Sequence, residues 1–222
     1  LLILAVYPTW IAPFFNKFSP LKDRVLKTKI IALLKKCGFT SQGLFVMDGS
    51  VRSNHGNAYF TGFGKNKRIV FFDTLLERLN HNEIEAVLAH ELGHFHHNHV
   101  KKRIVMMFIV SFIGLAMLGY FKDQSWFYHG LGITEPSNGS ALLLFMLVGP
   151  TFIFFIRPIM AFYSRQNEFE ADRYAKKHSS AKFLKESLVK LYRDNASTLT
   201  PDPLYSAFYD SHPPAIQRIA KL

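Results

Sequence analysis

Two long apolar stretches in the middle of the chain limit its possible folds more than any other feature. Residues 104–121 are 18 residues without a charge, and residues 141–156 are 16. The second stretch continues through Arg157 and Pro158 to Tyr163. A membrane-spanning helix needs about 17–25 mostly apolar residues. The first stretch has this length, and the second reaches it because the long side chain of Arg157 can extend to the membrane surface. The alternative is a pair of buried core helices.

The charges beside these stretches favour a membrane hairpin. Residues 101–103, Lys-Lys-Arg, directly precede the first stretch, whereas the loop 122–139 carries one lysine and two acidic residues. The positive-inside rule then places both outer ends of the hairpin in the cytoplasm and the loop across the membrane. We therefore expect an integral, multi-pass protein of the bacterial inner membrane or, in a eukaryote, of the endoplasmic reticulum membrane.

The composition supports a lipid environment. A net charge of +11 suits either nucleic acid or a membrane surface as partner. The 22 phenylalanines and the positive mean hydropathy favour lipid, and the sequence has no nucleic-acid recognition motif. We therefore expect the lipid bilayer as a partner and no nucleic acid. The single Cys37 excludes an internal disulfide framework and a zinc site made of several cysteines.

A metal-binding motif precedes the first apolar stretch. Residues 90–94 read His-Glu-Leu-Gly-His, which is the H-E-x-x-H pattern. Residues i and i+4 of a helix share a face, so His90 and His94 can point two imidazole nitrogens at one metal ion. Glu91 projects beside them and can take a proton from the attacking water, as in zinc proteases. The alternative is a solvated, histidine-rich helix.

A catalytic zinc site needs a third protein ligand, and the hairpin returns the chain to the same side near residue 163. Glu168 and Glu170 both follow that point. Asp172 lies one turn beyond Glu168 and shares its face, whereas Glu170 points away. Glu168 is therefore favoured as the ligand, with Asp172 bonding a ligand imidazole. His97 ranks below it, because three histidines on consecutive turns of one straight helix close a tetrahedral site poorly.

The remaining segments predict a core around the motif. Residues 83–92 are rich in helix formers, and Asn82 with Glu85 three residues later matches an N-cap pattern. We expect an amphipathic helix at 21–36, a small sheet of about three strands at 44–47, 57–60 and 68–72, and a short helix at 74–79. The expected parts are the end of a transmembrane or interfacial helix (1–20), the zinc-protease core (21–103), a transmembrane hairpin (104–163) and the rest of the core (164–222).

With these segments in this order, the chain resembles the membrane-integral CAAX prenyl proteases of type I, the a-factor-converting zinc endopeptidases. The resemblance covers nearly the whole chain, and many segments in the same order make it specific. The segments are Tyr7-Pro8, Ile11-Ala12-Pro13, Asn16-Lys17-Phe18, Gly49-Ser50, Arg52-Ser53, Asn57–Phe60, Lys65–Val70, Phe72–Leu75, Ala89–His94, Ser164-Arg165, Glu168-Phe169, Ala171-Asp172, Ser211–Pro214 and Arg218.

The resemblance implies a mainly α, membrane-integral fold with a small β-sheet and a gluzincin-like core, in which helices surround a water-filled chamber. It implies one zinc ion per chain, bound by His90, His94 and Glu168, with Glu91 as the base. It places Asp172 beside the ligands, and some accounts of the family make that residue a proton donor.

The resemblance also implies how a substrate is held. Asn57, Ala58 and Tyr59 would lie on an edge strand that pairs with the peptide backbone. His212 and Arg218 would lie near the zinc, where His212 could stabilise the oxyanion and Arg218 could contact substrate. The expected partner is a peptide or protein substrate cleaved near its C-terminus, whether prenylated or plain.

Three features differ from the family pattern. Judged by the resemblance, we expect the first membrane helices to be missing from this chain. The segment between Leu79 and Glu83 is also short, and His96-His97-Asn98 is unexpected after the motif. The first two predict a prokaryotic member without its first transmembrane helices. Two other functions stay open: an HtpX-type membrane quality-control protease, which shares the metal motif, and a non-catalytic metal-binding membrane protein.

Overall fold

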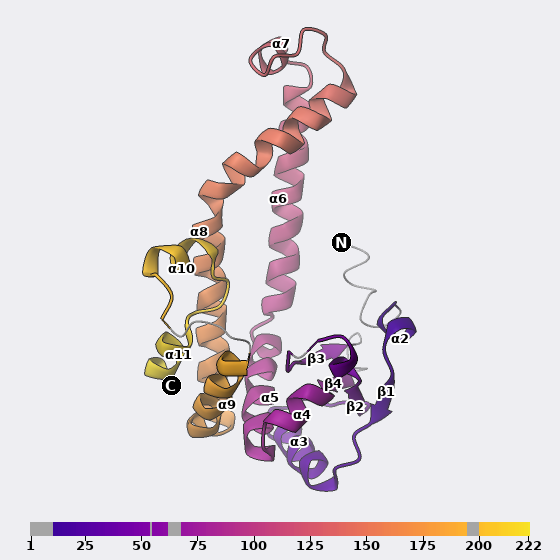
Figure 1. Cartoon of the computed structure of the whole chain (residues 1–222), viewed down its shortest axis with the longest axis vertical. Coiled ribbons are helices and arrows are strands. Elements are labelled where there is room, and N and C mark those ends of the chain that lie inside the picture. Colours follow the sequence, from indigo (N-terminus) through magenta and orange to yellow (C-terminus); the bar gives the residue numbers. More distant parts are fainter. Residues whose placement is uncertain (1–10, 54, 62–67, 195–199) are drawn as a thin grey trace. The chain divides into compact units, whose positions relative to one another are not determined.

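The computed structural model describes residues 11–53, 55–61, 68–194 and 200–222 (Figure 1). The chain forms two compact units. The first comprises Leu1–His97, Asn167–Pro201 and Pro213–Leu222, and the second comprises Asn98–Gln166 and Asp202–His212. The expected helix end at residues 1–20 falls partly outside the described residues. Its described part contains the four-residue helix α2 (Ala12–Phe15), whose two phenylalanines are exposed.

The first unit contains a mixed four-stranded sheet in the order β1-β2-β4-β3. Strands β2 (Leu44–Met47) and β4 (Arg68–Phe72) have the predicted bounds and pair in parallel, and β3 (Ala58–Thr61) pairs antiparallel with β4. The sequence analysis expected about three strands. The sheet has a fourth, β1 (Phe18–Pro20), which pairs antiparallel with β2. Its proline is tolerated there because an edge strand does not need every backbone donor.

Helices cover this sheet and build the apolar core. The amphipathic helix α3 (Arg24–Lys36) buries Leu26, Ile30 and Leu33 and packs against α5 (His81–His96). Helix α9 (Ala181–Asp194) also packs against α5. The unit further contains the short elements η2 (Gly49–Val51), α4 (Asp73–Arg78) and α11 (Ala215–Lys221).

Helix α5 begins earlier than the sequence suggested. The N-cap is Asn80, whose side-chain oxygen accepts hydrogen bonds from the backbone of Asn82 and Glu83, and the Glu83 carboxylate accepts the Asn80 backbone N–H at 2.8 Å. The predicted cap at Asn82 and Glu85 is therefore wrong. Both pairs match the pattern, but Glu83 is buried against Lys190 at 2.7 Å, and this tertiary contact selects the earlier start.

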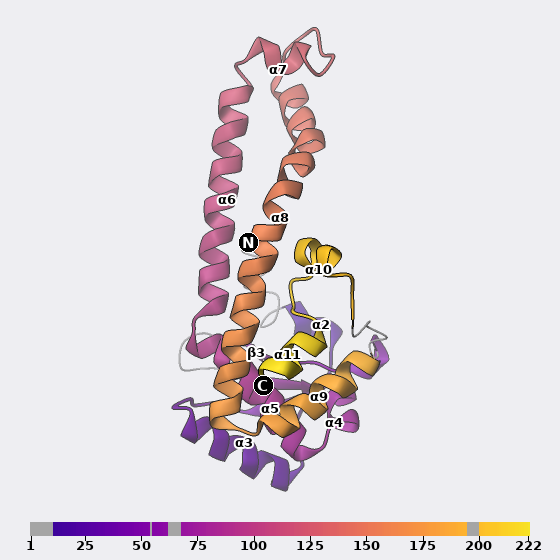
Figure 2. The same cartoon turned by 90° about the vertical axis from the view of Figure 1, so that its left-hand side faces the viewer.

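The second unit is built on two long helices. Helix α6 (His99–Phe121) begins five residues before the predicted apolar stretch. Helix α8 (Asn138–His178) continues without interruption through Pro150 and Pro158, and its residues from Asn167 onward belong to the first unit. The short helix α7 (Ser125–His129) joins α6 to α8 (Figure 2). Helix α10 (Pro203–Tyr209) completes this unit.

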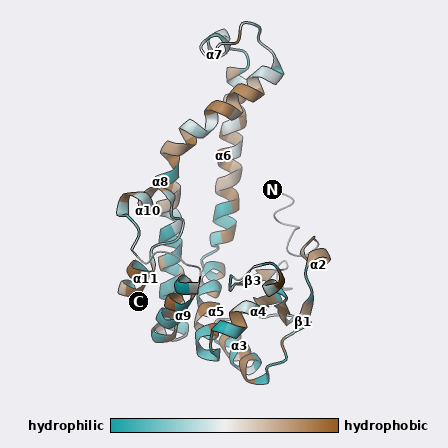
Figure 3. Cartoon of the chain, in the orientation of Figure 1, coloured by the Kyte–Doolittle hydropathy of each residue, from teal (hydrophilic) through white to brown (hydrophobic). Residues whose placement is uncertain are grey.

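Hydrophobic residues make up much of the ribbon of α6 and of the first part of α8 (Figure 3). Phe112 is 74% exposed, Leu115 67% and Phe155 67%. Both helices are long and apolar enough to cross a membrane. Near α7, Phe127 and Tyr128 form a small core with Ala141 and Leu144.

Candidate metal centre

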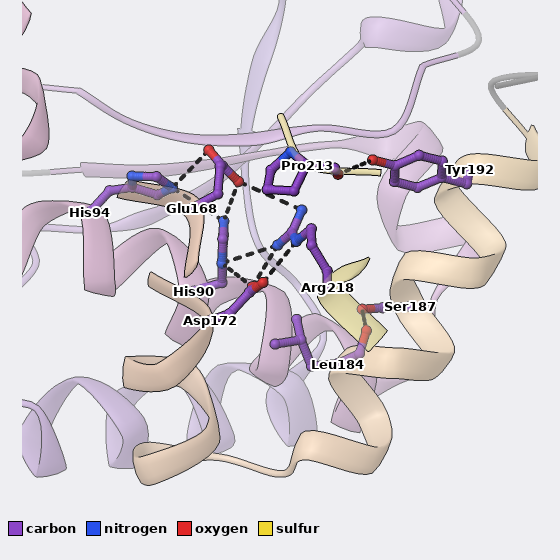
Figure 4. A network of polar contacts seen from close by, with 9 residues as sticks. All are labelled: His90, His94, Glu168, Asp172, Leu184, Ser187, Tyr192, Pro213 and Arg218. Atoms are coloured by element: carbon purple, nitrogen blue, oxygen red, sulfur yellow. Dashed lines mark hydrogen bonds and ion pairs between the residues drawn. The ribbon is translucent and has the colours of Figure 1, made fainter. Parts of the chain in front are cut away.

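Helices α5 and α8 bring three potential metal ligands together in the first unit (Figure 4). His90 and His94 are one turn apart on α5, and their Nε2 atoms are 3.2 Å apart. Glu168 on α8 places one carboxylate oxygen 3.4 Å from His90 Nε2 and the other 3.4 Å from His94 Nε2. Within the described ranges this is the only group of three or more His, Cys, Asp or Glu side chains arranged to hold a metal ion.

These three side chains fit a zinc ion. One ligand atom from each of them lies within 4.8 Å of the ligand atoms of the other two, which is close enough for all three to reach a single ion at about 2.0–2.2 Å. Two imidazoles and one carboxylate are also the donor set of catalytic zinc sites that keep the fourth position for water. The residues present therefore fit zinc by both proximity and chemistry.

Asp172 sets the orientation of the His90 ring. Its Oδ1 atom lies 2.9 Å from His90 Nδ1, one turn beyond Glu168 on the same helix. A proton held on Nδ1 by this carboxylate leaves the Nε2 lone pair directed toward His94 and Glu168. Glu168 and Asp172 share one face of α8, as their spacing predicted. The Glu168 carboxylate can bind the metal, and the Asp172 carboxylate orients the ligand His90.

Arg218 on α11 holds Asp172 in turn. Its Nε and Nη2 atoms donate to the two oxygens of Asp172 at 2.8 and 2.6 Å, and its Nη1 atom lies 3.6 Å from Glu168. The guanidinium is buried, as are both carboxylates. A planar guanidinium that binds one carboxylate through two parallel hydrogen bonds fixes its orientation as well as its charge. The spacing of the sequence did not reveal this contact, because α8 and α11 are far apart along the chain.

The electrostatics of the cluster favour a cation. The two carboxylates and one guanidinium leave a net buried charge of −1 when the histidines are neutral, which a divalent ion would offset. Burial lowers the pKa of His90, but hydrogen bonds to Asp172 and Glu168 outweigh it and raise that pKa to about 9. Metal binding must therefore release a proton from His90, because only neutral imidazole binds metal.

The model of peptidase family M48 matches residues 20–222. The chain belongs to peptidase family M48.

Curated relatives of this M48 chain are CAAX prenyl proteases. It is 40% identical to CAAX prenyl protease 1 homolog of Arabidopsis thaliana over 99% of its length and 52% of that protein. It is 37% identical to CAAX prenyl protease 1 of Saccharomyces cerevisiae over its full length and 52% of that protein. The chain thus spans about half the length of these relatives. The crystal structure of S. mikatae Ste24p matches 99% of this chain and 55% of its own, with a TM-score of 0.89 at 36% identity.

The edge strand of the M48 chain lies beside the metal helix. Strand β3 is the last strand of the sheet, and the ring of its Phe60 packs on Phe95 of α5, with ring centroids 4.6 Å apart. Phe95 directly follows His94. Ala58 and Tyr59 lie on β3, whereas Asn57 precedes it and is exposed, with its carbonyl accepting the Phe72 N–H at 2.9 Å. The sequence analysis missed the aromatic contact that holds this edge against α5.

The alternative ligands lie elsewhere in the M48 core. His97 is the C-cap of α5, and the next residue, Asn98, adopts a left-handed conformation with φ 56° that ends the helix. His97 and Glu170 line a separate cavity of about 480 Å³ together with Tyr174. Among the described residues, neither His97 nor Glu170 belongs to the ligand group of His90, His94 and Glu168.

His212 is exposed and belongs to the second unit, directly before Pro213 of the first. Glu91 follows His90 on α5 and is half-buried. Their catalytic roles stay predictions.

Proposed function

We propose that this M48 chain is the catalytic core of a membrane zinc metalloendopeptidase of the CAAX prenyl protease type I. The observation that carries the proposal is the group of two imidazoles and one carboxylate whose ligand atoms lie within 4.8 Å of one another, the donor set of catalytic zinc sites. His90, His94 and Glu168 would hold one zinc ion per chain. When bound, zinc lowers the pKa of a coordinated water toward about 7 and polarises the scissile carbonyl.

The residues around the ligands would move the protons of peptide hydrolysis. Glu91, next to His90, would accept a proton from the attacking water and pass it to the leaving amine. Asp172 would keep the His90 proton on Nδ1 throughout, and Arg218 would keep Asp172 ionised and in place. His212 would donate a hydrogen bond to the oxyanion that develops on the scissile carbonyl.

The substrate would be an extended peptide bound along β3. A peptide that adds to a sheet edge gains backbone hydrogen bonds with little demand on its side chains. The edge position of β3 and its contact with α5, one residue beyond His94, support this binding mode. The relatives are named CAAX prenyl proteases, which supports a prenylated peptide as the substrate class. Cleavage near the C-terminus, of prenylated or plain peptides, is part of the proposal.

Helices α6 and α8 would anchor the core in a bilayer. Their exposed apolar side chains and the Lys-Lys-Arg run at 101–103 support a hairpin with the metal centre toward the cytoplasm. The bacterial inner membrane expected from the sequence, or the endoplasmic reticulum membrane in a eukaryote, stays a prediction, as do the four domain boundaries.

Zinc content and cleavage of a C-terminal peptide, both measured on the purified protein in detergent, test this proposal. Glu91→Gln keeps the size of the side chain and removes the base, so we expect full zinc occupancy and a loss of roughly 10²–10⁴-fold in turnover. Glu168→Ala should lose both zinc and activity. Glu170→Ala, two residues away on the same helix, is the matched control and should keep both.

Full activity of Glu91→Gln would refute the mechanism. Unchanged zinc content in Glu168→Ala would show that another residue is the third ligand. A protein that binds zinc normally but cleaves no peptide in its unmodified form would be a metal-binding scaffold.

A further inference from the structure

Helix α11 brings Arg218 into the candidate metal centre. The guanidinium donates from Nε and Nη2 to the two oxygens of Asp172 at 2.8 and 2.6 Å, and Asp172 Oδ1 lies 2.9 Å from His90 Nδ1. All three residues belong to the first unit. The orientation of the His90 ring therefore depends on where α11 places the guanidinium.

Helix α11 cannot fix its own position. It has seven residues, and helices this short are not stable by themselves in water. Its N-cap is Pro214, whose side chain has no atom that accepts a hydrogen bond from the first turn. The helix must therefore be held by contacts with the rest of the first unit, and it packs against α9.

Tyr192 on α9 holds the chain where α11 begins. Its hydroxyl donates a hydrogen bond to the Pro213 carbonyl at 3.0 Å (Figure 4). Pro213, Pro214 and Ala215 are buried, and Ala215 is the first residue of α11. The two proline rings restrict the backbone between the bonded carbonyl and the helix. A hydrogen bond at Pro213 therefore also limits where α11 can lie.

The ring that carries this hydroxyl has a defined place of its own. Tyr192 is half-buried and packs against the apolar core of the first unit, which also contains Leu184 and Leu188 of α9. Core packing fixes the ring, and the hydroxyl at its tip bonds a backbone group. The hydrogen bond thus ties the start of α11 to the core.

We infer that Tyr192 is a positioning residue that fixes the start of α11 and, through Arg218 and Asp172, the orientation of the His90 ring. A contact outside the ligand group would thereby control one of the ligands. The expected effect on zinc rests on the proposed function, in which His90 binds the metal. The expected effect on the His90 ring does not require zinc.

Exchange of protons with water in the zinc-free protein measures the effect on structure. Tyr192→Phe removes only the hydroxyl, so the amides of residues 217–222 should exchange at least threefold faster than in the unmodified protein. The His90 Nδ1 proton, followed by NMR after labelling histidine with ¹⁵N, should also exchange at least threefold faster. Ser187→Ala is the matched control, because it removes an α9 hydroxyl that donates to the Leu184 carbonyl at 2.8 Å. It should leave both rates unchanged.

Zinc affinity, measured by competition with a chelator, shows the consequence for metal binding. Tyr192→Phe should weaken zinc binding about three- to tenfold, which is less than the effect of Arg218→Gln, because the guanidinium is loosened but still present. In the Arg218→Gln background the same substitution should cost less than twofold, because both residues act through Asp172. Ser187→Ala should bind zinc normally.

Unchanged exchange in Tyr192→Phe, either at 217–222 or at the His90 Nδ1 proton, would overturn the inference. Equal changes in Ser187→Ala would also overturn it, because they would reflect a general loosening of α9. Additive losses of zinc affinity in the double variant would show that Tyr192 acts through something other than Arg218. Unchanged zinc content in Glu168→Ala would instead refute the proposed ligand set, and exchange in the zinc-free protein would still decide the role of Tyr192.

Discussion

Helices α5 and α6 are separated in the sequence only by His97 and Asn98, yet the apolar side chains of α5 are buried and those of α6 are exposed. Helix α5 has Leu88 and Leu92 at 0% exposure. On α6, Phe112 is 74% and Leu115 67% exposed. The left-handed Asn98 marks the point where one pattern ends and the other begins.

The difference shows what each region needs. Buried charges such as Glu168 and Asp172 are tolerated only where a packed core excludes water and supplies partners. Helix α5 provides that core with the sheet, α3 and α9. Exposed apolar side chains on most of a helix surface are typical of a lipid environment, and soluble proteins rarely expose apolar patches of this extent. Under the proposed function, the chemistry belongs to the packed region and the anchoring to the exposed one.

The largest expected contrast comes from the same substitution in both helices. Leu88→Ala should lower the free energy of unfolding by about 2–5 kcal/mol, because it leaves a cavity in a closed core. Leu115→Ala should change it by about 0.5 kcal/mol or less, because its side chain contacts the detergent or lipid. Denaturant unfolding of both variants in one detergent measures the difference. Similar losses for both would mean that α6 is packed against protein.

Zinc affinity tests whether the charged cluster depends on its buried supports. Arg218→Gln should weaken zinc binding by roughly 10–100-fold, because Asp172 would lose the group that holds it against His90. Gln217→Ala, its exposed neighbour, should leave the affinity unchanged. Competition with a chelator measures both variants. A raised KM with normal zinc affinity would instead support the direct substrate contact predicted for Arg218 from the family resemblance.

Two glycines sharpen the comparison further. A Cβ atom at Gly93 would lie 2.8 Å from Ala171 Cα and 3.0 Å from Tyr174 Cβ, whereas one at Gly114 meets nothing within 4 Å. Gly93→Ala should destabilise by about 1 kcal/mol, because overpacking of about 1–3 kcal/mol exceeds the gain of about 1 kcal/mol in helix propensity. Gly114→Ala should be neutral or stabilising. A stabilising Gly93→Ala would show that α5 and α8 can separate at little cost.

The smallest expected effect on stability is that of cysteine substitutions that report membrane topology. Cysteines at Ser137 and Ser164, introduced with Cys37 replaced by serine, should leave stability unchanged and react from opposite sides. A membrane-impermeant reagent on the cytoplasmic side should label position 164 and spare position 137. Equal labelling of both positions from one side would contradict the hairpin.

The sequence predicted most of the local structure. The two apolar stretches became α6 and the first part of α8, the bounds of β2 and β4 matched, and Glu168 and Asp172 proved to share one helix. These features depend on periodicity, length and spacing, which neighbouring residues encode directly. The two histidines of the motif were likewise one turn apart because the helix repeat requires it.

Only the tertiary structure decided which residues meet across the chain. It selected Asn80 over Asn82 as the cap through the burial of Glu83 against Lys190, and it brought Arg218 onto Asp172 from 46 positions away. It also placed His97 and Glu170, which the spacing had ranked below Glu168 as ligands, along a separate cavity. Contacts of this kind depend on how helices pack and on where buried charges find partners, and no local pattern in the sequence records that choice.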